Sequence, residues 1–171
     1  HVRAPSRELS LDAIISDISD EDLRWVTEKI HYYLLRLLEE ADCDFIETVC
    51  EQLKERATFV KDMWEEGKYY FVAPQSYDEK TIRKKWGEQT PDFLFEFKNR
   101  LERLSNFSSN NIEKEFKLYL EEKQLGMGKL LPALRVSLTG LGMGPSLFDV
   151  ASLLGREETI KRIEIAIEKI N

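Results

Sequence analysis

Residues 129–155 read KLLPALRVSLTGLGMGPSLFDVASLLG. This stretch places two prolines and four glycines around two short apolar runs. Gly140 is the predicted end of a first helix. Gly144-Pro145 is the predicted start of a second, with Pro145 at the first helical position, where its missing N–H removes no helix hydrogen bond. Gly155 is the predicted end of that second helix. Two short helices joined this way need neighbours to bury against. A ligand could approach the glycine backbone closely, although a hairpin shaped by packing alone explains the glycines as well.

Apolar residues recur three and four positions apart along most of the chain, which predicts further helices. One runs from Leu23 to about Glu40, and a second, continuous helix runs from Ile46 to near Gly67. The aromatic segment Lys68–Pro74 has no partner strand elsewhere, so we expect an irregular connector or a helix end with its rings in the core. Rings that stack on bases are the less common alternative. The fold class is therefore all-α. The remaining expected helices are 78–86, one from Thr90 capped by that residue, one from Ser108 or Ser109 to Gly126, and a last one carrying Ile160, Ile163, Ile167 and Ile170.

The chain has 171 residues, of which 42% are hydrophobic and 33% charged, with a net charge of −7. No apolar run is long enough to cross a membrane. The net charge argues against binding nucleic acid through bulk electrostatics. Two stretches differ locally, because Lys80–Trp86 is basic and residues 129–162 are mildly positive. Solvated helix faces explain both stretches as well as RNA contacts do.

Catalytic and metal-binding motifs are missing from the sequence. Cys43 and Cys50 lie seven residues apart on one predicted helix, a rise of roughly 10.5 Å, which is too far for a disulfide. We expect buried thiols in a cytoplasmic protein. With only two histidines, a Cys/His zinc site is not expected. No complete phosphate-loop, GxSxG, HExxH or CxxC pattern occurs, so we expect no catalytic residue, metal or cofactor in this chain.

Three runs carry a resemblance to a known family: ALRVSLTG at 133–140, GPSLFD at 144–149 and LGREE at 154–158. They resemble the C-terminal anticodon-binding region of bacterial glutamyl-tRNA synthetases, whose pattern is roughly PLR-x-A-LTG, PGLFE and LLGKE. A second match lies at residues 54–80, where the family pattern is approximately ERxxTLxEF, YFFxxxxxYDEK. The resemblance covers about two-thirds of the chain, from Gln52 onward.

The resemblance implies a helical cage of two small subdomains, residues 1–73 and 74–171. The first would dock on the rest of the enzyme and read the third anticodon base, for which Arg56 occupies the family position. Arg135 matches the arginine that contacts the first two bases, and Pro145 and Leu147 match the loop that shapes their pocket. Gly144 departs from members with a threonine or another polar residue, so a side-chain hydrogen bond is lost there while a backbone contact can remain.

Arg56 also has an interpretation from the residue pattern alone. It lies about 80° from the centre of its helix's apolar stripe, at the rim of the buried face. The pattern by itself favours a surface arginine paired with Asp or Glu. As a base reader, its guanidinium has only donors. Those donors suit O2 and N3 of cytosine in glutamate anticodons and oppose the N–H groups of guanine in glutamine anticodons. The resemblance therefore implies that tRNA-Gln is rejected.

The resemblance further implies a glutamate–tRNA ligase whose ATP, Mg and glutamate chemistry belongs to an N-terminal Rossmann-type domain. Its HIGH-like and KMSKS-like motifs do not occur here, so the chain alone would be non-catalytic. The expected partners are the anticodon loop of tRNA-Glu and the enzyme's own catalytic domain, in a monomer. The competing interpretation is a helical protein-interaction module without RNA binding, which the net charge of −7 favours slightly. Salt dependence separates the two, because phosphate contacts release counterions.

Overall fold

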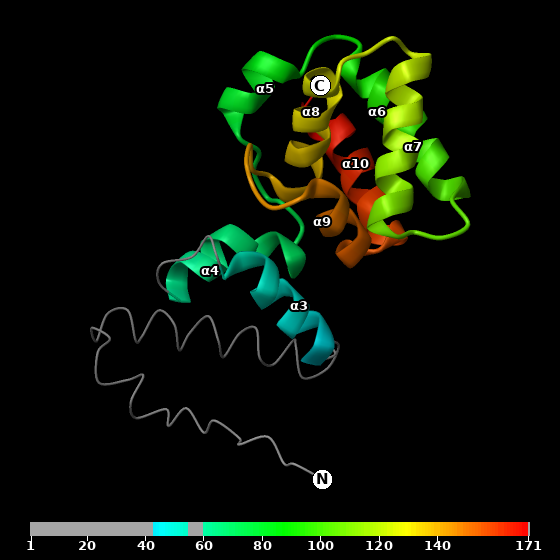
Figure 1. The fold of residues 1–171 in the computed structure, drawn as a ribbon. Coiled ribbons are helices and arrows are strands. Elements are labelled where there is room, and N and C mark those ends of the chain that lie inside the picture. Colours follow the sequence, from blue (N-terminus) through cyan, green and yellow to red (C-terminus); the bar gives the residue numbers. More distant parts are fainter. Residues whose placement is uncertain (1–42, 55–59, 171) are drawn as a thin grey trace, which may run out of the picture. The chain divides into compact units, whose positions relative to one another are not determined.

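The computed structural model describes residues 43–54 and 60–170, and the regular elements within these ranges are helices (Figure 1). The all-α prediction is confirmed, since the described ranges hold no strand. None of their helices combines the length and hydrophobicity needed to cross a bilayer. Arg56 and the helix expected at Leu23–Glu40 lie outside the described residues. The elements are α3 Cys43–Leu53, α4 Val60–Gly67, the 3₁₀ helix η1 Lys68–Tyr70, α5 Glu79–Lys85, α6 Thr90–Arg103, α7 Ser109–Glu122, α8 Met127–Thr139, α9 Leu147–Leu154 and α10 Arg156–Ile170.

The chain divides into two compact units, His1–Ile46 and Glu47–Asn171. The second unit contains nearly all of the described residues and both segments that resemble the synthetase family. The boundary expected between residues 73 and 74 falls inside this unit, and the roles assigned to the two sides of it remain predictions.

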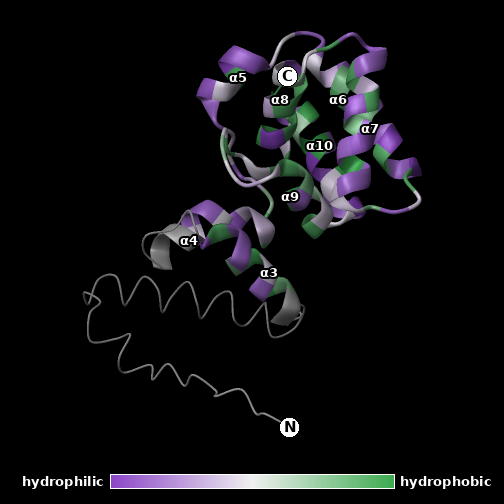
Figure 2. Ribbon diagram, viewed as in Figure 1, coloured by the Kyte–Doolittle hydropathy of each residue, from purple (hydrophilic) through white to green (hydrophobic). Residues whose placement is uncertain are grey.

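The core of the second unit lies among α6, α7, α8, α9 and α10, whose hydrophobic faces turn inward (Figure 2). Phe97 of α6 meets Phe116 of α7 edge-on, with ring centroids 5.0 Å apart, and Phe116 lies 5.6 Å from Phe148 of α9. Phe97 and Phe116 are completely buried. Each such side chain contributes roughly 1.5–3 kcal/mol through burial, so the aromatic cluster fixes how these helices pack.

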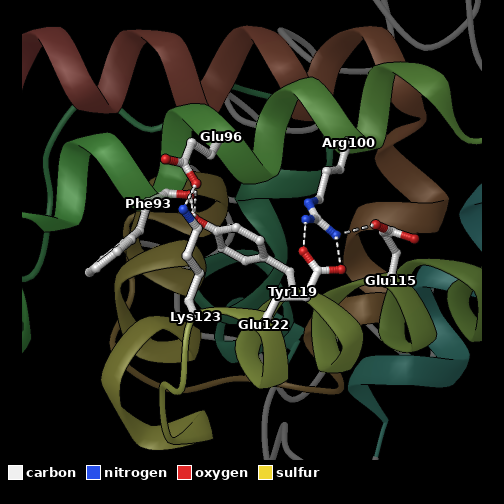
Figure 3. Close-up of polar contacts among 7 residues, drawn as sticks. All are labelled: Phe93, Glu96, Arg100, Glu115, Tyr119, Glu122 and Lys123. Carbon is white, nitrogen blue, oxygen red and sulfur yellow. Dashed lines mark hydrogen bonds and ion pairs between the residues drawn. The ribbon is translucent and has the colours of Figure 1, made fainter.

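A polar network joins α6 to α7 at the edge of this core (Figure 3). Arg100 pairs with Glu122 and, at 3.1 Å, with Glu115. The hydroxyl of Tyr119 lies 3.0 Å from the carbonyl oxygen of Phe93 and 3.1 Å from a carboxylate oxygen of Glu96, which also pairs with Lys123. Burial, and then the hydrogen bond to Glu96, raise the pKa of Tyr119, so this phenol stays a neutral donor. Helices α6 and α7 are thus held together by aromatic contacts in the core and by ion pairs at its edge.

Two of the predicted helix ends are confirmed by their backbone angles. Gly140 ends α8 with φ 75° and Gly155 ends α9 with φ 80°. The end of α7 was predicted wrongly at Gly126. The helix stops at Glu122, and Gln124 takes the left-handed conformation with φ 55°. The N–H of Leu125 then donates to the carbonyl of Leu120 at 2.8 Å, which satisfies an orphan carbonyl at the helix end.

Two helix starts and the role of Gly126 also differ from the sequence prediction. Pro145 is not the first residue of α9, which begins at Leu147 after Ser146 in the N-cap position. Thr90 is the first residue of α6, and Gln89 is the N-cap residue. The Thr90 hydroxyl accepts the N–H of Gly87, which precedes the helix, at 2.9 Å. Gly126, expected to end a helix, instead precedes α8 as its N-cap.

The helix predicted from Ile46 to near Gly67 is described in two parts. These are α3, which is followed by a turn at Lys54, and α4, whereas residues 55–59 lie outside the described part. The end at Gly67 is confirmed. Cys50 was expected to be buried and is exposed, because Val49 and Leu53, one turn apart, form the inward face of α3.

Candidate nucleic-acid interface

The glycine turn after α8 packs closely against the segment that leads into α5. A Cβ on Gly140 would come within 2.7 Å of the Ser76 carbonyl oxygen, and one on Gly142 within 2.8 Å of an Asp78 carboxylate oxygen. The carbonyl of Gly140 accepts the N–H of Asp78 at 2.9 Å. Asp78 in turn caps α5 by accepting the N–H of Thr81 at 2.9 Å. Packing within the chain therefore explains the glycines at 140 and 142.

Gly144, the third glycine of the turn, lies beside the guanidinium of Arg135. A Cβ at Gly144 would be 3.0 Å from Nη1 of Arg135 and 3.9 Å from the hydroxyl of Tyr69. Arg135 is half-buried on α8, and Tyr69 belongs to η1, which contacts both α8 and α9. The structure thus brings together two predicted site residues, Arg135 and Gly144, and adds Tyr69 from the aromatic segment, which was not among the predicted site residues.

Tyr69 and Tyr70 lie in η1, which follows α4 directly, so the structure has the expected helix end and not an irregular connector at these residues. The prediction of buried rings is confirmed for both. Their side chains are 2% and 5% exposed, and the ring centroids are 4.6 Å apart. Tyr70 donates a hydrogen bond to the amide oxygen of Gln52 on α3. Burial, then the neighbouring Tyr69 and Asp149, raise the pKa of Tyr70, while Arg135 opposes this shift. Tyr70 therefore stays a neutral phenol close to the Arg135 charge.

Arg162 holds the aromatic segment in place, and sequence reasoning missed this. Its side chain is only 3% exposed. Nη1 donates to the carbonyls of Tyr69 at 2.6 Å and Leu138 at 2.9 Å, and Nε pairs with Glu158 at 2.7 Å. Leu138 lies in the last turn of α8, where helix carbonyls lack an intrahelical partner. Burial lowers the pKa of Arg162, and the ion pair with Glu158 opposes that shift.

The basic stretch at 129–162 is not one surface. Arg162 points into the core, and Arg156 donates to the carbonyl of Leu104, just after α6. Lys129 and Lys161 are exposed on different helices. Among these five basic residues, Arg135 is the one that lies beside the glycine turn.

The remaining predicted site residues occupy different environments. Pro145 is half-buried, and Leu147 is 2% exposed in the hydrophobic core. Leu147 can therefore shape the site only by fixing the start of α9. Met143, between the last two glycines of the turn, is 76% exposed. Arg56, the expected reader of the third base, lies outside the described residues.

The described residues contain no group of three or more His, Cys, Asp or Glu side chains that could hold a metal ion. The site combines a guanidinium with the glycine turn and two buried tyrosines. A guanidinium recognises hydrogen-bond acceptors, which the edges of unpaired bases provide.

The comparisons with known proteins identify the class. A family model described as an anticodon binding domain matches residues 25–167, and the chain belongs to this family. The relatives it resembles are glutamate–tRNA ligases, which confirms the family recognised from the sequence motifs.

Among these relatives, the enzyme of Phocaeicola vulgatus is 43% identical over 129 residues, which are 75% of this chain and 26% of the relative. That of Flavobacterium psychrophilum is 43% identical over 124 residues, 72% of this chain and 25% of the relative. A crystal structure of a glutamate tRNA ligase from Elizabethkingia meningosepticum in complex with its amino acid matches with TM-score 0.73 and 34% identity, over 90% of this chain and 33% of that one. The chain thus spans about a quarter of the length of the curated relatives it matches.

Proposed function

We propose that this chain recognises the anticodon of tRNA-Glu on behalf of a glutamate–tRNA ligase. Membership of the anticodon binding domain family and similarity to glutamate–tRNA ligases support the proposal. The observation that carries it is the position of the Arg135 guanidinium beside Gly144 and the Tyr69 hydroxyl. A strong donor group there lies beside a turn whose residue 144 carries no side chain.

The chemistry of unpaired bases suits this site. Anticodon bases expose their Watson–Crick edges, where ring carbonyls accept hydrogen bonds. Arg135 offers donors only and cannot lose its charge at neutral pH. We assign it to the first two anticodon bases. Gly144 exposes backbone groups that can complete the contact, and Pro145 and Leu147 fix the path of the turn.

Arg56 is assigned to the third base. In this proposal its guanidinium donates hydrogen bonds to the O2 and N3 acceptors of cytosine. Guanine presents N1–H and N2–H₂ donors instead, which cannot pair with the donors of the guanidinium. The ligase would then be a discriminating one that rejects tRNA-Gln. Family members with glutamine at this position would be the relaxed ones.

The rest of the proposal concerns the longer enzyme. A catalytic domain that this chain contacts would attach glutamate to tRNA-Glu, using ATP and Mg. We expect a cytoplasmic, monomeric enzyme.

Binding of an RNA hairpin with the anticodon stem and loop of tRNA-Glu tests the proposal. The chain should bind it with an affinity that falls as salt rises, because phosphate contacts release counterions. Arg135→Ala should weaken binding by about 1–3 kcal/mol, the range of a bidentate base contact. Arg103→Ala, on the exposed end of α6, is the matched control and should leave binding unchanged. Absence of binding at low salt would reject the proposal and favour the protein-interaction module.

A further inference from the structure

The short helix α5 is fixed against α8 at both ends. At its start, the carboxylate of Asp78 accepts a hydrogen bond from the N–H of Thr81. The backbone N–H of Asp78 donates to the carbonyl of Gly140. At its end, Lys85 donates to the carbonyl of Gly128 at 3.1 Å. That carbonyl lacks its usual helix partner, because Pro132, four residues on, has no N–H. The orientation of α5 is therefore set by the same helix that carries Arg135.

Helix α5 consists mainly of hydrophilic residues (Figure 2), and one side of it is basic and exposed. Lys80, Arg83 and Lys84 are spaced three and four residues apart, so they share a side of the helix, and all three are exposed. Thr81 and Ile82 are half-buried. We call Lys80, Arg83 and Lys84 the α5 basic surface.

Part of the basic charge in the same unit is committed to carboxylates, at Lys98, Arg100, Lys117, Lys123 and Arg162. Other basic residues stay exposed, among them Arg103, Lys114 and Lys161, so position and not the lack of a pair distinguishes α5. In the part of the chain that the structure describes, Lys80 and Lys84 form no ion pair with a carboxylate. Arg83 pairs with Glu79, but both side chains are 79% exposed, so this pair contributes little and can be exchanged for another anion.

The position of the α5 basic surface indicates its ligand. The cap of α5 contacts Gly140 and Gly142, and the same turn continues to Gly144 beside Arg135. An RNA whose bases reach Arg135 would have its sugar–phosphate backbone close to this turn. Phosphate contacts from lysine and arginine position a nucleic acid without reading its sequence. We propose that the α5 basic surface binds backbone phosphates of the tRNA arm, an inference that rests on the function proposed above.

The test compares two triple variants of equal charge change. The first is Lys80→Ala with Arg83→Ala and Lys84→Ala. The control is Arg103→Ala with Lys114→Ala and Lys161→Ala, three exposed residues from α6, α7 and α10. The probe is the tRNA-Glu anticodon hairpin, with Kd measured between low and moderate salt. Circular dichroism and thermal melting check that each variant keeps the wild-type fold. Replacing Lys80 and Lys84 by arginine provides a further variant that retains the charge.

The α5 variant should bind roughly 10-fold more weakly, and the slope of log K against log salt should become shallower by about 2, since each of the three lost phosphate contacts removes roughly 0.7 unit on single-stranded nucleic acid. The loss should be equal for hairpins of different loop sequence. The control triple and the arginine variant should keep the wild-type slope. If the wild-type chain binds and both triple variants have the same slope, the α5 inference is overturned while the proposed function stands. If the wild-type chain does not bind at all, the proposed function fails and this inference fails with it.

Discussion

Arg135 has five N–H donors and no acceptor, so a base is favoured at this site only if it presents acceptors. The neighbouring Gly144 leaves the space in which the guanidinium lies, because a Cβ there would stand 3.0 Å from Nη1. A larger residue at 144 would require Arg135 to move by a few tenths of an ångström. Glycine at this position thus gives up a side-chain hydrogen bond to RNA and leaves room for the arginine.

Arg162 stabilises the same site through its hydrogen bonds to the carbonyls of Tyr69 and Leu138, and replacing Arg162 tests that role. Arg162→Met leaves the carbonyls of Tyr69 and Leu138 buried without their donor and Glu158 without its partner. We expect the free energy of unfolding to fall by about 3 kcal/mol, measured by urea denaturation. Arg103→Met, at an exposed position, should change it by no more than about 0.5 kcal/mol. Equal effects of the two substitutions would contradict the assigned role.

The role of Arg162 could not be read from the sequence. The isoleucines of α10 predicted an apolar face through Ile160, Ile163, Ile167 and Ile170. The buried residues are Thr159, Arg162, Ile163 and Ala166, with Ile167 partly buried against the core. A buried arginine is stable only with partners, and here they include carbonyls from η1 and α8, far away in the chain. Helical periodicity contains no information on such partners.

At the scale of elements, the glycine turn couples α8 to α5. Gly140 combines a left-handed backbone with a close approach to Ser76, so a side chain is excluded for two independent reasons. The turn also receives the N–H of Asp78, the residue that caps α5. A substitution at Gly140 should therefore perturb α5 as well as the end of α8.

Gly140→Ala should lower the free energy of unfolding by at least about 1–2 kcal/mol, from strain at φ 75° and from the contact with the Ser76 carbonyl. Gly128→Ala is the matched control, since a Cβ there meets nothing within 4 Å. It lies inside α8, so stability should stay the same or rise by up to about 1 kcal/mol. Chemical denaturation of both variants checks the contrast. A Gly140 variant as stable as the Gly128 variant would show that the turn is not strained.

Helix boundaries were predictable where one residue type is required and not elsewhere. Gly140 and Gly155 adopt positive φ, which glycine adopts at little cost, and both ends were predicted correctly. Gln124 adopts φ 55° without being glycine, so the end of α7 gave no signal in the sequence. The start of α9 was misplaced, because Pro145 suits the first turn of a helix but lies just before the cap here.

For the whole molecule, net charge was a poor guide to where a polyanion could bind. The chain carries −7 overall, and the acidic residues of α6, α7 and α10 are largely committed to ion pairs with lysine and arginine. The α5 basic surface lies apart from those pairs, and the glycine turn connects its helix to the turn residue beside Arg135. The motif resemblance identified Arg135 and Gly144, whereas their proximity and the contribution of Tyr69 and Tyr70 emerged only from the packed structure.

The central claim is that this chain reads the glutamate anticodon. The most direct measurement compares Kd for the tRNA-Glu anticodon hairpin with Kd for the same hairpin carrying G as its third anticodon base. We expect a preference for C of about 5- to 150-fold, equivalent to about 1–3 kcal/mol, and we expect Arg56→Gln to reduce that preference. Equal affinity of the wild-type chain for both hairpins would contradict recognition of the third base, and equal affinity for a hairpin of unrelated anticodon would contradict the central claim.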